Sequence, residues 1–152
     1  MRRVETTEVD RLKGKSHPKG YLYSFERLRV WNEARKLHKK LYDLTQTFPR
    51  SEMYGFTSQI KRAAVSVAAN LAEGCSRRSR KDQAHFTEIA YGSLTELACL
   101  LILAMDVELL SAQEEANLRG QIDPISRQLI ALNPSTLNQS TFSACEYPTL
   151  SI

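Results

Sequence analysis

The 152-residue sequence lacks the features of several large protein classes. Its three cysteines, Cys75, Cys99 and Cys145, are widely spaced and form no CxxC pair, so we expect reduced, unligated thiols rather than a disulfide framework or a zinc knuckle. The longest apolar run, residues 97–105, is far shorter than a bilayer span. The charged N-terminus has no apolar segment of the kind found in secretory signals. These absences predict a soluble, cytoplasmic protein.

Motifs for enzymatic chemistry are also missing from the sequence. It contains no Gly-rich phosphate loop, no GxSxG elbow and no HExxH pair. None of the three histidines, His17, His38 and His85, follows a Glu by three residues, as the Glu-x-x-His pairs of a di-iron bundle require. We therefore predict a protein that is not an enzyme, with no catalytic residues, no metal site and no cofactor.

Glycine and proline are scarce, with six and five residues, which excludes a collagen-like or low-complexity chain. No segment alternates with a period of two, whereas apolar residues recur at helical spacing in residues 25–48, 57–73, 80–110 and 111–132. Short connections between these segments favour antiparallel neighbours. We predict an all-α fold, an up-down-up-down antiparallel four-helix bundle over residues 24–132. A mobile basic arm (residues 1–23) and an irregular Ser/Thr-rich tail (residues 133–152) flank it.

Small polar residues and helix breakers predict where the four helices begin and end. N-terminal caps are expected at Ser24, at Thr57 or Ser58, at Ser79 and at Ser111. Gly74 stands where the second helix would end in a left-handed residue. Gly120 and Pro124 lie inside the fourth pattern, so we expect a kink or a break there.

A stripe of polar residues runs along the second helical segment. Its members are Gln59, Arg62, Ser66, Asn70 and Glu73, at spacings of three and four that place them on one face. Because most of the segment is otherwise apolar, we expect the stripe to face another subunit or a narrow pore, with Glu88 or Glu96 supplying a carboxylate to Arg62. An ordinary solvated face is the alternative.

The formal charge of +4 conceals an uneven order of charges along the chain. Residues 1–23 carry a net +3, residues 24–81 a net +8 and residues 82–152 a net −7. Two basic clusters stand out: Arg35, Lys36, Lys39 and Lys40 in the first helical segment, and Arg77, Arg78, Arg80 and Lys81 between the second and third. Such clusters can neutralise phosphates. Pairing with the acidic half, within or between subunits, and simple solvation are the alternatives.

The segment YGFTSQIKRAAVSVAANLAEGCSRRSRKDQ, residues 54–83, resembles the signature of the four-helix bundle proteins called 23S ribosomal RNA intervening-sequence proteins. Three further pieces agree: Phe25 with Leu28-x-Val30-Trp31 and Ala34, Phe48-Pro49 with Glu52, and residues 89–97. The resemblance covers residues 25–132. It implies a four-helix bundle that assembles as a homopentamer. The accessory variability determinant of diversity-generating retroelements, a basic pentamer that binds nucleic acid and a reverse transcriptase, is a similar protein.

The resemblance assigns roles to residues of this chain. The positions that match the family and would form subunit contacts are Gln59, Arg62, Ser66, Asn70, Glu73 and Glu96. We expect a non-enzymatic homo-oligomer, pentameric by the resemblance, that binds nucleic acid, in particular structured RNA, through the two basic clusters. The alternative is a protein-interaction scaffold whose charges pair between subunits.

Overall fold

The computed structural model describes residues 22–132, and every regular element in this range is helical. A 3-10 turn, η1 (Ser24–Arg27), precedes α2 (Arg29–Thr45), and a second turn, η2 (Arg50–Glu52), leads to α3 (Phe56–Ser76), α4 (Arg80–Asp106) and α5 (Ala112–Leu132). The predicted all-α class is therefore confirmed for these residues. Apart from residues 22 and 23, the predicted arm and tail lie outside the described residues.

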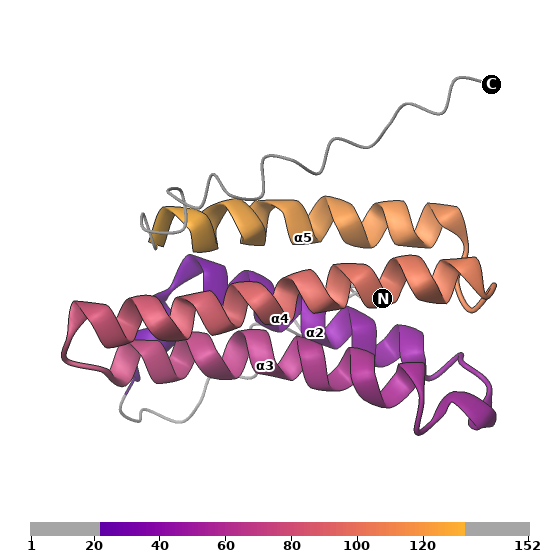
Figure 1. Cartoon of the computed structure of the whole chain (residues 1–152), viewed down its shortest axis with the longest axis horizontal. Helices are drawn as coiled ribbons and strands as arrows, with labels where there is room; N and C mark the ends of the chain where they lie inside the picture. Colours follow the sequence, from indigo (N-terminus) through magenta and orange to yellow (C-terminus); the bar gives the residue numbers. More distant parts are fainter. Residues whose placement is uncertain (1–21, 133–152) are drawn as a thin grey trace, which may run out of the picture.

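The four long helices form a closed ring. Each packs against its neighbours in sequence, and α2 also packs against α5. Figure 1 shows successive helices joined at alternating ends of the bundle, so neighbours run antiparallel. One polar contact links the first and last helices directly, because Gln128 Nε2 on α5 donates a hydrogen bond to Glu33 Oε2 on α2.

The apolar stripes predicted from helical spacing form the centre of the bundle. The largest fully buried side chains are Leu41, Ile60, Val67, Leu94, Leu97, Leu101, Ile125 and Leu129. The apolar residues at helical spacing in α3, namely Ile60, Ala63, Ala64, Val67 and Leu71, are buried, whereas Ile89 of α4 and Val107 just after it are exposed. By length and composition alone α4 could cross a bilayer. A core helix of a soluble bundle passes the same test, so this single helix is weak evidence for a membrane span.

The first helix does not start where the sequence suggested. Ser24 is not its cap: it opens η1, and the extended residue Leu28 separates this turn from α2. The Asn32 side chain stabilises the interruption, since its Nδ2 donates to the carbonyl oxygens of Glu26 and Leu28 at 2.9 and 3.0 Å. The helical period of the apolar residues continues across Leu28, which is why the spacing concealed the break.

The beginning and end of α3 also differ from the prediction. Gly55, rather than Thr57 or Ser58, occupies the N-cap position, and the Glu52 carboxylate accepts a long 3.5 Å hydrogen bond from the Phe56 amide. Gly74 is not a left-handed terminus, because α3 continues through it to Ser76. Gly74 instead lets α3 approach α4: a Cβ at this position would lie 3.2 Å from Phe86 Cβ.

The caps of the last two helices are confirmed. Ser79 Oγ accepts a hydrogen bond from the Asp82 amide at 3.0 Å at the start of α4. Ser111 and Glu114 form a reciprocal capping box, with the Ser111 amide donating to Glu114 Oε2 at 2.8 Å and the Glu114 amide to Ser111 Oγ at 3.2 Å. Glu114 Oε2 also accepts from the Ser111 hydroxyl at 2.8 Å, and the hydrogen bonds from the Ser111 amide and hydroxyl lower the pKa of the Glu114 carboxyl.

The expected break in the last helix does not occur, since α5 runs without interruption through Pro124. A proline cannot donate to the carbonyl four residues earlier, which here belongs to Gly120. Gly120 is exposed, so water can satisfy that carbonyl. The buried residues Ile122 and Ile125 on the inner face hold the helix to the core on both sides of the proline.

Candidate nucleic-acid interface

The first basic cluster lies along α2. Its residues are Arg35, Lys36, Lys39 and Lys40, and all four side chains are exposed. Helical spacing puts them opposite the buried stripe of Ala34, Leu37 and Leu41. Arg35 lies over the ring of Trp31 at 5.8 Å, which restrains its guanidinium beside an apolar surface.

The second basic cluster spans the turn between α3 and α4 and the first two residues of α4, at one end of the bundle (Figure 1). Arg77, Arg78, Arg80 and Lys81 are all exposed. Arg77 is held in place, because its Nη2 donates to Glu73 Oε1 and its guanidinium lies 4.7 Å from the centre of the Phe86 ring. The Ser79 cap fixes the start of α4 between the other three basic residues.

The ion pairs of the described residues leave most of the two clusters unpaired. Within residues 22–132 the pairs closer than 4.0 Å are Arg29–Glu33, Arg77–Glu73 and Arg119–Glu115. The hydrogen bond from Arg29 lowers the pKa of the Glu33 carboxyl against an opposing effect of burial. Seven of the eight predicted phosphate-binding residues, all but Arg77, therefore make no such pair with another residue of the range 22–132.

The polar stripe of α3 divides into two parts. Ser66 and Asn70 are half-buried against α4 of the same chain: Ser66 Oγ and Ser93 Oγ are 2.7 Å apart, and Asn70 Nδ2 donates to Ser66 Oγ at 3.0 Å. This contact accounts for Ser93, the buried polar residue of α4. Glu73 is exposed and bound to Arg77.

The other stripe residues line a polar hollow on the outer surface. Gln59 and Arg62 of α3, Glu96 of α4 and Tyr54 share a depression of about 320 Å³. The expected ion pair to Arg62 does not form within the described part of the chain, because neither Glu88 nor Glu96 lies within 4.0 Å of its guanidinium. Tyr54 is 90% exposed. The hollow joins the outer faces of α3 and α4.

Apolar side chains on these outer faces escaped the sequence analysis. Val65 of α3 is 50% exposed and Leu103 of α4 is 45% exposed, and Ile89 and Ile102 are also at the surface. Val65, Ile102 and Leu103 fall between the positions of the core stripes, so the helical period itself turns them away from the core. Ile89 keeps the spacing of the α4 stripe, and only the rotation of α4 in the bundle brings it to the surface.

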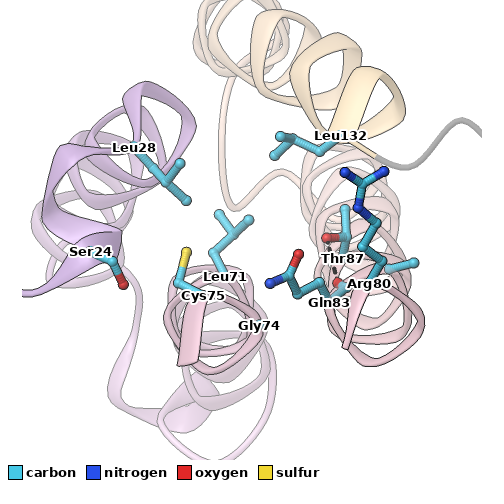
Figure 2. A pocket seen from close by; sticks show the side chains of 10 residues that line it. Ser24, Leu28, Leu71, Gly74, Cys75, Arg80, Gln83, Thr87 and Leu132 are labelled. Carbon is cyan, nitrogen blue, oxygen red and sulfur yellow. Dashed lines mark hydrogen bonds between the residues drawn. The ribbon is translucent and has the colours of Figure 1, made fainter. Parts of the chain in front are cut away.

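A cavity on a different side of α3 from the polar hollow was also not predicted from the sequence. It lies where η1, α3, α4 and α5 meet, and Figure 2 shows side chains from all four elements around it. Burial raises the pKa of the Cys75 thiol in its wall, so this thiol is protonated at neutral pH. Among residues 22–132, no three His, Cys, Asp or Glu side chains are grouped to hold a metal ion.

Comparison with known proteins places this geometry in a family. The family model for the 23S rRNA-intervening sequence protein matches residues 26–131. The chain belongs to that family. The match includes both basic clusters, the α3 stripe and all residues lining the cavity except Ser24 and Leu132. Membership confirms the resemblance seen in residues 54–83, and the family name denotes no enzymatic activity.

A solved structure shares the fold of the chain. A crystal structure of a protein with unknown function from the S23 ribosomal protein family of Bacteroides thetaiotaomicron superposes with a TM-score of 0.64 at 20% sequence identity. The alignment covers 68% of this chain and 96% of that one. No curated protein is significantly similar to the chain. At 20% sequence identity the structural similarity establishes a common fold and nothing about function.

Proposed function

We propose that this protein is a cytoplasmic, non-enzymatic homo-oligomer that binds structured RNA through the basic clusters on α2 and on the α3–α4 turn. The observation that carries the proposal is the set of seven exposed basic side chains without an ion pair among the described residues. Within residues 22–132 no acidic side chain pairs closely with these seven, so their charges are open to phosphates.

The chemistry of the clusters fits a phosphate backbone. Each lysine or arginine that contacts a phosphate releases condensed counterions, so binding weakens steeply with salt. Such contacts position a nucleic acid and carry no sequence information. The two clusters therefore predict strong salt dependence with little base preference, and the family name makes ribosomal RNA the first ligand to test.

The deciding experiment measures the affinity of the full chain for fragments of 23S ribosomal RNA over a salt series. Each phosphate contact adds about 0.7 to 0.9 to the slope of log affinity against log salt. Replacing Arg35, Lys36, Lys39 and Lys40 together by Gln should reduce the slope by about 3 if all four contact phosphates. The matched control, Arg119→Gln with Arg127→Gln on α5, should leave the slope unchanged. Undetectable affinity at low salt would refute RNA binding.

The outer faces of α3 and α4 support self-association. Val65, Leu103 and their exposed apolar neighbours adjoin the polar hollow of Arg62 and Glu96, and a second copy would bury both. We expect a pentamer, as the resemblance implies. Light scattering at micromolar concentration should give an oligomeric mass, and Val65→Asp should reduce it. A monomeric mass for the natural chain would contradict this part of the proposal.

The protein-interaction scaffold is distinguished by what co-purifies with the chain. An RNA-binding oligomer loses its partner on nuclease treatment, whereas a scaffold retains a protein partner. Recovery of one stoichiometric protein after nuclease treatment, together with salt-insensitive RNA affinity, would favour the scaffold.

A further inference from the structure

The cavity at the end of the bundle has the size of a small-ligand site. Its volume is about 670 Å³, within the roughly 300–1,000 Å³ range of pockets that bind organic molecules. Leu28 after η1, Leu71 on α3 and Leu132 on α5 point toward one another across it (Figure 2). Gly74 contributes no side chain to its floor. Three apolar walls thus surround a space that none of the lining side chains fills.

The remaining wall is polar and comes from the first two turns of α4. Gln83 Nε2 donates to the Arg77 carbonyl oxygen at 2.8 Å, which fixes the amide and leaves its Oε1 as an acceptor toward the cavity. The Thr87 hydroxyl donates to the Gln83 carbonyl oxygen at 2.9 Å. Oriented polar groups on one wall and leucines on the others suit a flat, largely apolar group with hydrogen-bonding edges.

The charge around the cavity selects an anionic ligand. Among the described residues no acidic side chain lines it, and Arg80 is the one permanently charged residue that does. Arg80 makes no ion pair with another described residue, and it belongs to the basic cluster of the α3–α4 turn. The same turn supplies Arg78 and Lys81, both exposed. An apolar cavity therefore opens directly beside the surface proposed to hold phosphates.

We propose that this cavity receives the base of an unstacked nucleotide of the bound RNA, while Arg80 holds the adjoining phosphate. The inference rests on the proposed function and narrows its ligand to RNA with an unpaired nucleotide, such as a bulge or loop. Taking a base out of a helix costs a few kcal/mol, least where the base is already unpaired. Proteins that read RNA accordingly contact splayed bases in loops and bulges rather than paired stems.

The test compares two RNA hairpins that differ by one unpaired nucleotide, 2-aminopurine, in the stem. The full chain should bind the bulged hairpin about tenfold more tightly than the fully paired one. The fluorescence of the 2-aminopurine should change on binding, because the base leaves its stacked neighbours. Equal affinity for both hairpins, with the salt dependence intact, would overturn the inference and leave the proposed function standing. Binding of neither hairpin at low salt would overturn both.

Substitutions that fill the cavity distinguish the contribution of base insertion to RNA affinity from the contribution of phosphate contacts. Ala84→Phe places a ring into the lined space, and Cys75→Leu fills it from the opposite wall should the first variant unfold. Either folded variant should bind the paired hairpin as the natural chain does and lose the tenfold preference. The matched control Ala116→Phe, exposed on α5, should keep it. A preference that survives both filling variants would place the unpaired base elsewhere.

A free mononucleotide offers the same chemistry as an unstacked residue of RNA. Adenosine monophosphate is therefore titrated into the natural chain and the Ala84→Phe variant. Weak binding to the natural chain alone, well below the affinity of the bulged hairpin, supports a site that serves RNA. Binding of the free nucleotide more tightly than the bulged hairpin would assign the cavity to a small ligand and overturn the RNA inference.

Discussion

Replacing Gly74 by Ala tests the close packing of α3 on α4. In an ordinary helix interior this change stabilises by about 1 kcal/mol, because glycine is the poorer helix former. At Gly74 the new Cβ would lie 3.2 Å from Phe86 Cβ and 3.5 Å from the Gln83 carbonyl oxygen. Phe86 Cβ is bonded to the α4 backbone, so it cannot turn away and the helices must separate.

The magnitudes decide the sign of the effect. Overpacking a tight site costs about 1–3 kcal/mol, which exceeds the gain in helix propensity near the end of α3. We expect Gly74→Ala to destabilise by about 1 kcal/mol. Gly120→Ala on α5 is the matched control, because nothing lies within 4 Å of its added Cβ, and it should stabilise by up to about 1 kcal/mol.

Thermal and urea unfolding at one fixed protein concentration measure the difference, since the Tm of an oligomer depends on concentration. About 4 °C per kcal/mol in a domain of this size puts the two variants roughly 8 °C apart. A Gly74→Ala protein that is as stable as Gly120→Ala would refute the close approach at Phe86.

Three further predictions concern the core and the caps. Leu97→Ala should destabilise the bundle by about 2–5 kcal/mol in urea unfolding, because Leu97 is fully buried. Ser66→Ala and Ser93→Ala should each cost about 1 kcal/mol and the double variant less than their sum, as a double-mutant cycle would show. Ser111→Ala should raise the pKa of Glu114 in an NMR titration. Because the folded pKa is depressed, the capping box stabilises above the usual carboxyl range and loses its effect as pH falls through the lowered value.

The fold could be predicted because its determinants are periodic. Leu94, Leu97 and Leu101 recur at helical spacing and are buried together. Ser111 and Glu114 carry their hydrogen bonds within three residues, so the sequence alone identified their cap. The ends that were misplaced depend on contacts beyond that range or on ambiguous residues. Gly74 suits both a left-handed terminus and a close helix contact, and only the position of α4 decides between them.

The sequence predicted which residues belong to the candidate site, but not how these residues are arranged in space. The sequence shows that Arg78, Arg80 and Lys81 are clustered, but not which acidic residues approach them. Cavities are harder still, because Leu28, Leu71 and Leu132 are far apart in the chain and meet only when the ring of helices closes. Nothing in their local pattern distinguishes a wall of a cavity from a part of the core.

The ring order of the helices gives the molecule an electric polarity. Basic residues predominate through α2, α3 and their turns, and acidic residues predominate in α4 and α5, so the chain is a dipole across the bundle. A polyanion that diffuses toward such a molecule experiences a torque before any contact forms, and the basic side turns to meet it. The acidic side repels every misdirected encounter. The separation of charge thus raises the rate at which a polyanion associates in the right orientation. This effect is independent of the affinity of the complex that then forms.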